Sequence, residues 1–278
     1  MTGTTTGAGR ASGRPAAFFD LDKTVIAKSS TLAFSKPFQA GGLLSRRAVL
    51  RSAYAQFVYQ VGGADHDQME KMRQFLSALC AGWDVQTVRD IVADTLHNIV
   101  DPLVYDEAVS LIEEHHLAGR DVIIVSASGA EVVEPIGELL GADGVVATRM
   151  RIVDGRYTGE IDYYAYGEHK AAALQRLAEE HHYDLSRSYA YSDSATDVHM
   201  LEVVGHPFAV NPDRELRKEA LARGWPVLVF TRRVALRSRM RLPQSRPTLA
   251  AMALGTAAVV GAAVYVAARR RLVRGESN

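Results

Sequence analysis

The residues best suited to chemistry lie near the start of the chain, at Asp20 and Asp22. Largely apolar residues at 16–19 run directly into them. Such a run is typical of a buried strand in a parallel sheet, and open α/β sheets bind ligands just beyond the carboxyl ends of their strands. Two carboxylates there have the types needed for a nucleophile or metal ligand and for a general acid/base. The alternative interpretation is a turn or a helix N-cap, where Asp is common.

Three later stretches supply further groups of this kind. The apolar run 122–125 ends in Ser126, Lys170 opens a helical pattern, and a short β-like run ends in Asp193, with Asp197 four residues on. A hydroxyl, an ammonium group and further carboxylates are what phosphoryl transfer uses. Each has a plain structural alternative: a helix cap for the serine, a solvated first-turn position for the lysine, and a charged helix N-terminus for the two aspartates.

Taken in order, these motifs resemble those of the haloacid dehalogenase superfamily. The set is Asp-x-Asp-x-Thr, a strand ending in Ser, a lone Lys and Asp-x-x-x-Asp, and it extends over residues 16–231. The tripeptide Asn-Pro-Asp at 211–213 is similar to one in the branch that contains the phosphoserine phosphatases. The resemblance implies an α/β fold with a Rossmann-like parallel sheet and an α-helical cap inserted after the first strand. It also implies Mg²⁺-dependent hydrolysis of a phosphomonoester through an aspartyl-phosphate.

The resemblance also implies a role for each carboxylate. Asp20 is expected to attack phosphorus, while Asp22 protonates the leaving alkoxide and later deprotonates the attacking water. The expected Mg²⁺ ligands are Asp20, the backbone carbonyl of Asp22 and Asp193, with Asp197 as a further ligand or as support. Mg²⁺ suits such a set because it prefers oxygen ligands and binds through few carboxylates plus substrate phosphate.

Three residues are expected to form the substrate-binding site, and two positions depart from the family pattern. Ser126 is expected to donate to a phosphate oxygen, Lys170 to neutralise the phosphate, and Thr24 to anchor the loop after the first strand. Ser29 stands where phosphoserine phosphatases carry a Glu for the substrate amine, and Thr196 stands where Asn is usual. Because Ser29 offers no counter-charge to an ammonium group, the substrate class stays open.

Composition limits the classes of partner. The chain has 278 residues and a formal net charge of zero, without the basic excess of a typical nucleic-acid-binding protein. Cys80 is the only cysteine, so an intrachain disulfide is impossible. We therefore expect no nucleic-acid partner, and the resemblance implies a phosphorylated small molecule or lipid instead.

The sequence divides into segments of different character. The expected order is a disordered leader at 1–14, an α/β core at 15–28 and 119–231, a helical cap at 29–118, a basic linker at 232–248, a transmembrane helix at 249–268 and a basic tail at 269–278. Within the cap, Asp84 is expected to cap a helix at 85–96, and Pro102 to open another at 103–117. Asp154-Gly155 predicts a hairpin turn in the core.

The last apolar stretch carries the prediction of membrane attachment. Residues 249–268 contain no charged side chain, and about 20 such residues span a bilayer. Arginines flank both ends, so the positive-inside rule does not orient the helix. Without a signal peptide, we expect a single-pass protein of the cell membrane with a cytoplasmic catalytic domain. A row of small residues, Ala253, Ala257 and Gly261, is compatible with a weak homodimer. A buried or interfacial helix is the alternative.

Two classes of function follow. The first is a membrane-anchored, Mg²⁺-dependent phosphomonoester hydrolase acting on a small phosphate ester or on a phosphorylated lipid precursor. The second is a membrane-tethered regulatory protein that binds a phosphorylated ligand without turnover. The altered fourth motif, in which Ser192 and Ser194 replace Gly, supports the second class. Release of phosphate distinguishes the two.

Overall fold

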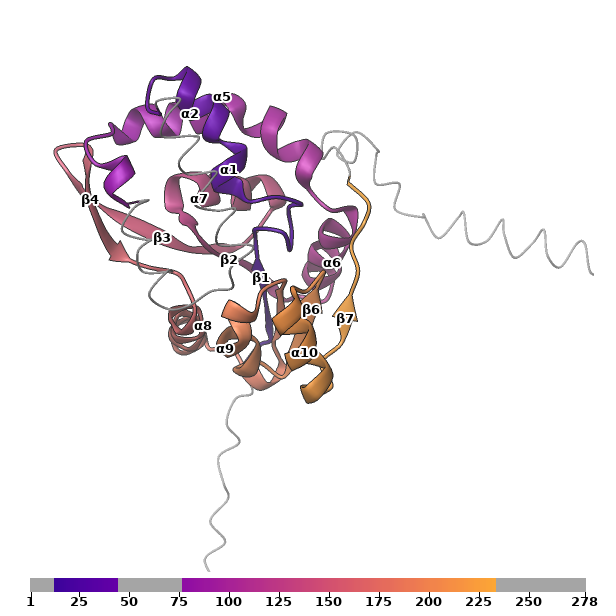
Figure 1. Cartoon of the computed structure of the whole chain (residues 1–278). Coiled ribbons are helices and arrows are strands. Elements are labelled where there is room, and N and C mark those ends of the chain that lie inside the picture. Colours follow the sequence, from indigo (N-terminus) through magenta and orange to yellow (C-terminus); the bar gives the residue numbers. More distant parts are fainter. Residues whose placement is uncertain (1–12, 45–76, 234–278) are drawn as a thin grey trace, which may run out of the picture. The chain divides into compact units, whose positions relative to one another are not determined.

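A sheet of seven strands forms the centre of the molecule. The computed structural model describes residues 13–44 and 77–233. The strand order is β4-β3-β2-β1-β5-β6-β7, and all neighbours are parallel except the antiparallel pair β3–β4 (Figure 1). The strands are β1 (Ala16–Asp20), β2 (Asp121–Gly129), β3 (Gly144–Val153), β4 (Arg156–Tyr163), β5 (Tyr189–Ser192), β6 (His206–Val210) and β7 (Val227–Leu228). The predicted α/β fold with a parallel sheet is confirmed.

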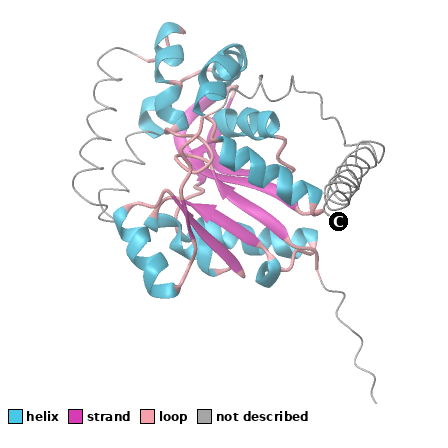
Figure 2. Ribbon diagram, turned by 90° about the vertical axis from the view of Figure 1, so that its right-hand side faces the viewer, coloured by secondary structure: helices cyan, strands magenta, loops and turns pink. Residues whose placement is uncertain are grey.

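Helices cover both faces of this sheet, because side chains alternate between the faces along each strand. On β1, Ala17 and Phe19 belong to the core cluster shared with α6 (Asp106–Leu117) and α7 (Ala130–Leu140). Ala16 and Phe18 belong to the cluster shared with three other helices. These are α8 (Glu168–His181), α9 (Val198–Glu202) and α10 (Arg214–Arg223). Figure 2 shows helices on both faces of the sheet. Burial on both faces explains the continuous apolar run before Asp20, and each buried Phe contributes roughly 1.5–3 kcal/mol.

The register of the strands brings the motif residues to one edge. Asp20 pairs with Val125, so Ser126 stands one residue beyond it on β2. Phe19 pairs with Tyr191, so the next residues, Asp20 and Ser192, end their strands at the same level. Because these strands are parallel, all their carboxyl ends meet at this edge.

Short helices follow β1, and a longer one precedes the return to the sheet. They are α1 (Ser30–Ala33), α2 (Ser35–Ala40) and α5 (Val85–Val100), which lie near one another and near α7 (Figure 1). The Asp84 carboxylate accepts the Thr87 N–H at 2.8 Å, so the predicted cap of α5 is confirmed, although this helix runs further than residue 96. The part of the expected helical cap at 45–76 lies outside the described residues.

The helix expected at 103–117 begins later than predicted. Pro102 lies in a short 3₁₀ helix, η1 (Asp101–Leu103), and α6 starts at Asp106. Val104 is extended instead, because it pairs with Ile26 in an antiparallel bridge. The Tyr105 N–H also donates to the Val25 carbonyl at 3.0 Å. This part of the expected cap range therefore pairs with the loop after Asp22, and α6 packs on the sheet beside β2.

The predicted hairpin is present between β3 and β4. Asp154 and Gly155 both have positive φ, 49° and 74°, as a two-residue turn of this type requires. Hydrogen bonds from Gly82 and Val85 to carbonyls of this hairpin connect it to the start of α5. The hairpin thus joins the sheet to the helices that follow β1.

The end of the described chain is held by side chains from both sides. The Asn211 side chain accepts the Phe230 N–H and donates to the Phe230 carbonyl, both at 3.0 Å, and so acts as an extra strand residue beside β7. Glu107 on α6 accepts the N–H groups of Thr231 and Arg232 at 3.1 Å. The segment after β7 is therefore fastened to the start of α6.

No helix within residues 13–44 and 77–233 is both long enough and apolar enough to cross a membrane. The expected span at 249–268 lies outside these ranges, as do the basic tail and residues 1–12 of the leader expected at 1–14. Arg14, at the end of that leader, forms an ion pair with Asp121 on β2. The prediction of a span stays a prediction.

A buried histidine joins α6 to the sheet. His115 Nδ1 accepts the Arg120 Nε–H at 2.8 Å, and His115 Nε2 lies 2.9 Å from the Tyr191 hydroxyl. Because Nδ1 is the acceptor, the neutral ring carries its proton on Nε2. Burial, and then the Arg120 charge, lower the pKa of His115 from 6.5 to about 4. The folded protein therefore favours the neutral imidazole.

This arrangement predicts a pH dependence of stability. Between pH 6.5 and about 4 the unfolded His115 binds more proton than the folded one, so the stabilisation is complete above pH 6.5 and is lost as the pH falls towards 4. Over this window we expect the wild type to lose on the order of 2 kcal/mol more unfolding free energy than His115→Gln does. Urea unfolding at several pH values measures both, and parallel pH profiles would contradict the prediction.

Candidate active site

The centre of the site is an ammonium group between two carboxylates. Lys170 Nζ lies 2.6 Å from Asp20 Oδ1 and 2.8 Å from Asp197 Oδ2. Lys170 is the third residue of α8, Asp20 ends β1, and Asp197 ends the 3₁₀ helix η3 (Ala195–Asp197). The Lys170 residue is only 2% exposed, which excludes a solvated first-turn lysine. The structure thus brings together three of the residues singled out from the sequence.

This cluster holds more carboxyl groups than cationic groups. Burial alone would lower the pKa of Lys170, but the Asp197 and Asp20 carboxylates outweigh it and raise that pKa, so Nζ keeps its proton. Asp193 is also buried nearby, and burial together with the Asp20 charge raises the pKa of its carboxyl to about 8. One ammonium therefore faces three carboxyl groups, and a further cation would relieve their repulsion.

The donor atoms fit Mg²⁺. Among residues 13–44 and 77–233, no three Asp, Glu, His or Cys side chains form a metal cluster. Mg²⁺ needs only one or two carboxylates beside water and phosphate, and Asp20, Asp193 and the Asp22 backbone carbonyl are an all-oxygen set of that kind. Asp197 Oδ2 is already engaged by Lys170 and by the Ser192 hydroxyl at 2.7 Å. Its buried Oδ1 has no hydrogen-bond partner in the described part of the chain, so Asp197 can support Lys170 through Oδ2 and still offer Oδ1 to a cation.

The Asp22 carboxylate is held separately from this cluster. Its Oδ1 accepts the Ser30 N–H at 2.6 Å, and its Oδ2 accepts the Ser128 hydroxyl at 2.9 Å. Burial raises the pKa of Asp22, and the bonds from Ser30 and Ser128 oppose that rise. A carboxyl group with a raised pKa keeps a proton more readily, as a general acid must.

The remaining predicted residues also lie at this edge. Ser126 is buried within β2, and its hydroxyl oxygen accepts the Ser128 N–H at 3.2 Å. The N-cap of α7 is Gly129, so the alternative of a helix cap for Ser126 is excluded. Thr24 is fully buried, and its hydroxyl lies 3.5 Å from Asp193 Oδ1, which places it beside the expected metal ligand.

The Asn-Pro-Asp tripeptide supports the loop that carries Asp193. The Asp213 carboxylate caps α10 by accepting the Leu216 N–H at 2.7 Å. The same carboxylate accepts the Ala195 N–H at 3.1 Å, and the Asp213 N–H donates to the Asp193 carbonyl at 2.7 Å. Asp213 therefore fixes both sides of this loop.

Three serines of the site were not predicted from the sequence. They are Ser30 and Ser128, which hold Asp22, and Ser192, which donates to Asp197. Ser128 had a usable signal, because it stands two residues after Ser126 at the end of the same strand. Ser29, the position that departs from the family pattern, is the N-cap of α1, and its side chain makes no capping bond.

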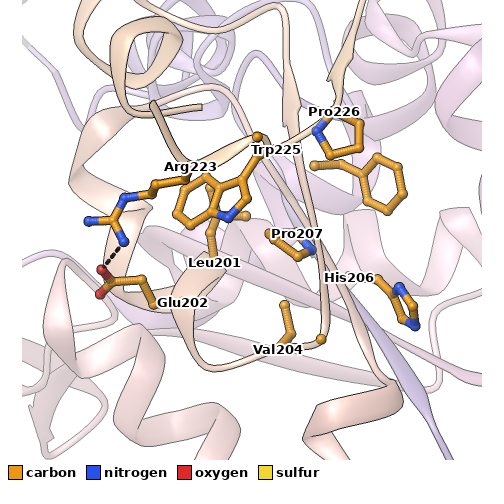
Figure 3. Close-up of a pocket in the computed structure, with 11 residues that line it drawn as sticks. Leu201, Glu202, Val204, His206, Pro207, Arg223, Trp225 and Pro226 are labelled. Carbon is orange, nitrogen blue, oxygen red and sulfur yellow. Dashed lines mark ion pairs between the residues drawn. The ribbon is translucent and has the colours of Figure 1, made fainter. Parts of the chain in front are cut away.

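A separate pocket of about 420 Å³ lies at the other end of the sheet (Figure 3). Trp225, Pro226 and Pro207 line it, and Arg223 and Glu202 form an ion pair of 2.7 Å at its side. It adjoins the start of β6, whereas Asp20 and Asp193 follow the ends of parallel strands. This pocket is therefore not part of the carboxylate site.

Comparison with known proteins supports the same interpretation. A family model described as haloacid dehalogenase-like hydrolase matches residues 17–202. A Streptomyces azureus protein named "Inhibition of morphological differentiation protein" is 67% identical over 93% of this chain and 95% of its own. Two Mycobacterium tuberculosis proteins also match: a "Probable phosphatase", 59% identical over 93% of this chain and 90% of its own, and a "Phosphoserine phosphatase", 33% identical over 92% and 81%.

A solved structure is similar in fold. It is a phosphoserine phosphatase described as a phospho-aspartyl intermediate analogue, with a TM-score of 0.59 and 19% sequence identity. The match covers 82% of this chain and 98% of that one. At this identity the likeness extends to the fold, which agrees with the sheet described above.

The buried ion pairs predict a large effect of removing Lys170. In Lys170→Ala, two buried carboxylates lose their counter-charge, and we expect a loss of about 3–5 kcal/mol of unfolding free energy. Urea unfolding in the presence of a chelator, beside Lys218→Ala as the control, measures it. Lys218 pairs with Glu215 on the exposed face of α10 and should contribute less than about 1 kcal/mol. Equal stabilities of the two variants would contradict the prediction.

Proposed function

The chain belongs to the haloacid dehalogenase-like hydrolases and is a phosphatase of the phosphoserine-phosphatase-like branch, and on this premise we propose that it hydrolyses phosphomonoesters through a phosphoenzyme formed on Asp20. One observation carries the proposal: the Lys170 ammonium is fixed 2.6 Å from the Asp20 carboxylate at the carboxyl edge of the sheet. An ionised carboxylate with a free lone pair is the nucleophile that such a reaction needs.

The side chains divide the reaction between them. An oxygen of Asp20 attacks phosphorus, and the electron pair of the breaking P–O bond goes to the leaving oxygen, which takes a proton from Asp22. Asp22 then removes a proton from a water molecule, which attacks phosphorus and frees Asp20. Burial raises the pKa of Asp20 to about 7, and Lys170 opposes that rise and so favours the ionised nucleophile. Ser126 is the hydroxyl donor to the phosphoryl oxygens. The phospho-aspartyl analogue described for the phosphoserine phosphatase supports an intermediate of this kind.

A magnesium ion fits into this scheme beside Asp20 and Asp193. When bound, it supplies positive charge that offsets the carboxylates and the oxygens of the transferred phosphoryl group. Burial and the Asp20 charge raise the pKa of the neighbouring Asp193 carboxyl to about 8, and such a positive charge would stabilise its ionised form. We therefore include Mg²⁺ dependence in the proposal.

The substrate is proposed by class only. A Ser at position 29 brings no charge to the start of α1, so a substrate amine would find no partner there. The candidates are a small soluble phosphate ester and a phosphorylated lipid precursor. The second is motivated by the uncharged stretch 249–268, which we propose to anchor a cytoplasmic catalytic domain to the cell membrane.

A regulatory role is the second candidate. The name of the Streptomyces relative, 67% identical, refers to inhibition of morphological differentiation. The chain would then act on a phosphorylated signal, or bind one without turnover as the altered fourth motif suggests. Stabilisation by a phosphate ester without phosphate release would favour this candidate.

The proposed reaction predicts a clear result in a phosphate-release assay. We expect the full-length protein to release phosphate from a panel of phosphomonoesters only when Mg²⁺ is present. Asp20→Asn, which keeps the shape but removes the nucleophile, should reduce the rate by at least about 10³-fold. Glu215→Gln, on an exposed face, is the matched acidic control and should retain wild-type activity. No phosphate release from a folded, Mg²⁺-binding wild type would contradict the proposal.

The proposed anchor predicts a result in a flotation assay. We expect the full-length protein to float with phosphatidylglycerol–phosphatidylcholine vesicles and to resist extraction by high salt, because apolar insertion does not depend on ionic strength. Val259→Arg combined with Val260→Arg should abolish salt-resistant flotation, since each charge near the middle of a span costs about 2.5–3.5 kcal/mol. Salt-resistant binding of this variant at the wild-type level would contradict an inserted helix.

A further inference from the structure

Two serines from different parts of the chain hold the carboxyl group of Asp22 on both sides. The Ser30 N–H donates to Asp22 Oδ1 at 2.6 Å, and the Ser128 hydroxyl donates to Oδ2 at 2.9 Å. The Ser30 hydroxyl in turn donates to Ser128 Oγ at 2.9 Å. Ser30 thus contacts Asp22 twice, once directly and once through Ser128. The three residues form a closed ring of hydrogen bonds.

The sheet itself turns Ser128 towards this ring. The pairing of β2 with β3 shifts register between Ser126 and Gly129, as in a β-bulge. A bulge leaves residues out of the ladder and redirects their side chains, and bulges are frequent beside active sites. Ser128 is 8% exposed and Ser30 is fully buried, so both hydroxyls need protein partners. The Asp22 carboxyl group is the end of their chain and accepts the Ser128 hydroxyl.

The ring joins three elements of the fold. Asp22 follows β1, Ser128 lies at the end of β2, and Ser30 is the first residue of α1. A carboxyl group has about four lone-pair directions, and these two bonds use one on each oxygen. The remaining directions keep a fixed orientation, because the plane of the group cannot rotate without breaking both bonds.

We propose that Ser30 and Ser128 are positioning residues that orient the Asp22 carboxyl group for proton transfer to the leaving oxygen. The inference rests on the role proposed above for Asp22. It adds that α1, where the inserted helices begin, must sit against the end of β2 for that proton transfer to be efficient. A displacement of α1 breaks both contacts of Ser30 at once.

The test compares two esters that need the general acid to different extents. An alkyl phosphate leaves as a strongly basic alkoxide and needs the proton, whereas an aryl phosphate with an electron-poor phenol leaves without it. In the full-length protein we expect Ser128→Ala to lower kcat/KM for the alkyl ester by about 10–100-fold, a part of the usual contribution of a general acid. The aryl ester should lose less than about threefold. kcat/KM reports the steps up to phosphoryl transfer to Asp20. The later hydrolysis of the phosphoenzyme by water therefore does not affect the comparison.

A second pair of variants tests the ring itself. Ser30→Ala keeps the backbone N–H and removes the hydroxyl, so its effect should be smaller than that of Ser128→Ala and in the same direction. The double variant should be no worse than Ser128→Ala alone, because both hydroxyls act through one chain. If the losses of kcat/KM in the two single variants added up in the double variant, the two hydroxyls would not act through one ring, and this part of the proposal would be wrong.

The matched control is a buried serine at the other end of the sheet. The Ser188 hydroxyl accepts the Ala16 N–H at 3.0 Å and donates to the Asp184 carbonyl at 2.7 Å, away from Asp22. Ser188→Ala should lower stability without changing the ratio of the two esters. Equal losses on both esters in Ser128→Ala would overturn the positioning role and leave the phosphatase proposal intact. Absence of turnover of either ester by the wild type would instead overturn the phosphatase proposal.

Discussion

The structure depends on one buried ammonium group. Lys170 is placed by α8 between carboxylates that arrive from β1 and from the loop after β5, more than 170 residues apart in the chain. Two carboxylates without it would be unpaired charges in a dry environment, which proteins rarely tolerate. Burial raises the pKa of Asp20 to about 7, and the same ammonium opposes that rise, so the group that stabilises the fold also favours the ionised form of the proposed nucleophile. Stability and reactivity cannot be separated at this point.

The parallel sheet makes this arrangement possible without any special loop geometry. Asp20, Ser126 and Asp193 lie far apart in sequence, yet each lies at or near the carboxyl end of a strand, and the strands are neighbours in register. Position at the shared edge is therefore set by backbone hydrogen bonds. The surrounding serines then adjust orientation: Ser192 for Asp197, and Ser30 with Ser128 for Asp22. Coarse placement comes from the sheet, and fine orientation comes from short hydroxyl contacts.

Most of the site was predictable because its chemistry is local to strand ends. The apolar run before Asp20 indicated its place at the carboxyl edge, and the family resemblance placed Lys170 beside it; the structure agrees with both. The start of α6 was not predictable, because Val104 pairs with Ile26 far away in sequence and local helix signals carry no information on such pairing. The roles of Ser30 and Ser128 depend on a bulge in β2 and on where α1 begins, and neither leaves a periodic pattern. Long-range contacts account for each of these differences.

The amide that closes the sheet beside β7 has a chemical consequence. Asn211 holds the Phe230 backbone through both its oxygen and its nitrogen, so conversion of this amide to a carboxylate would remove a donor and place two acceptors against each other. Asparagine usually undergoes that ageing reaction when the nitrogen of the next residue attacks its side-chain carbonyl. Here the next residue is Pro212, whose nitrogen carries no hydrogen. The contact between Asn211 and the segment after β7 therefore depends on an asparagine that resists spontaneous deamidation by this route. This contact is thereby protected over the lifetime of the protein.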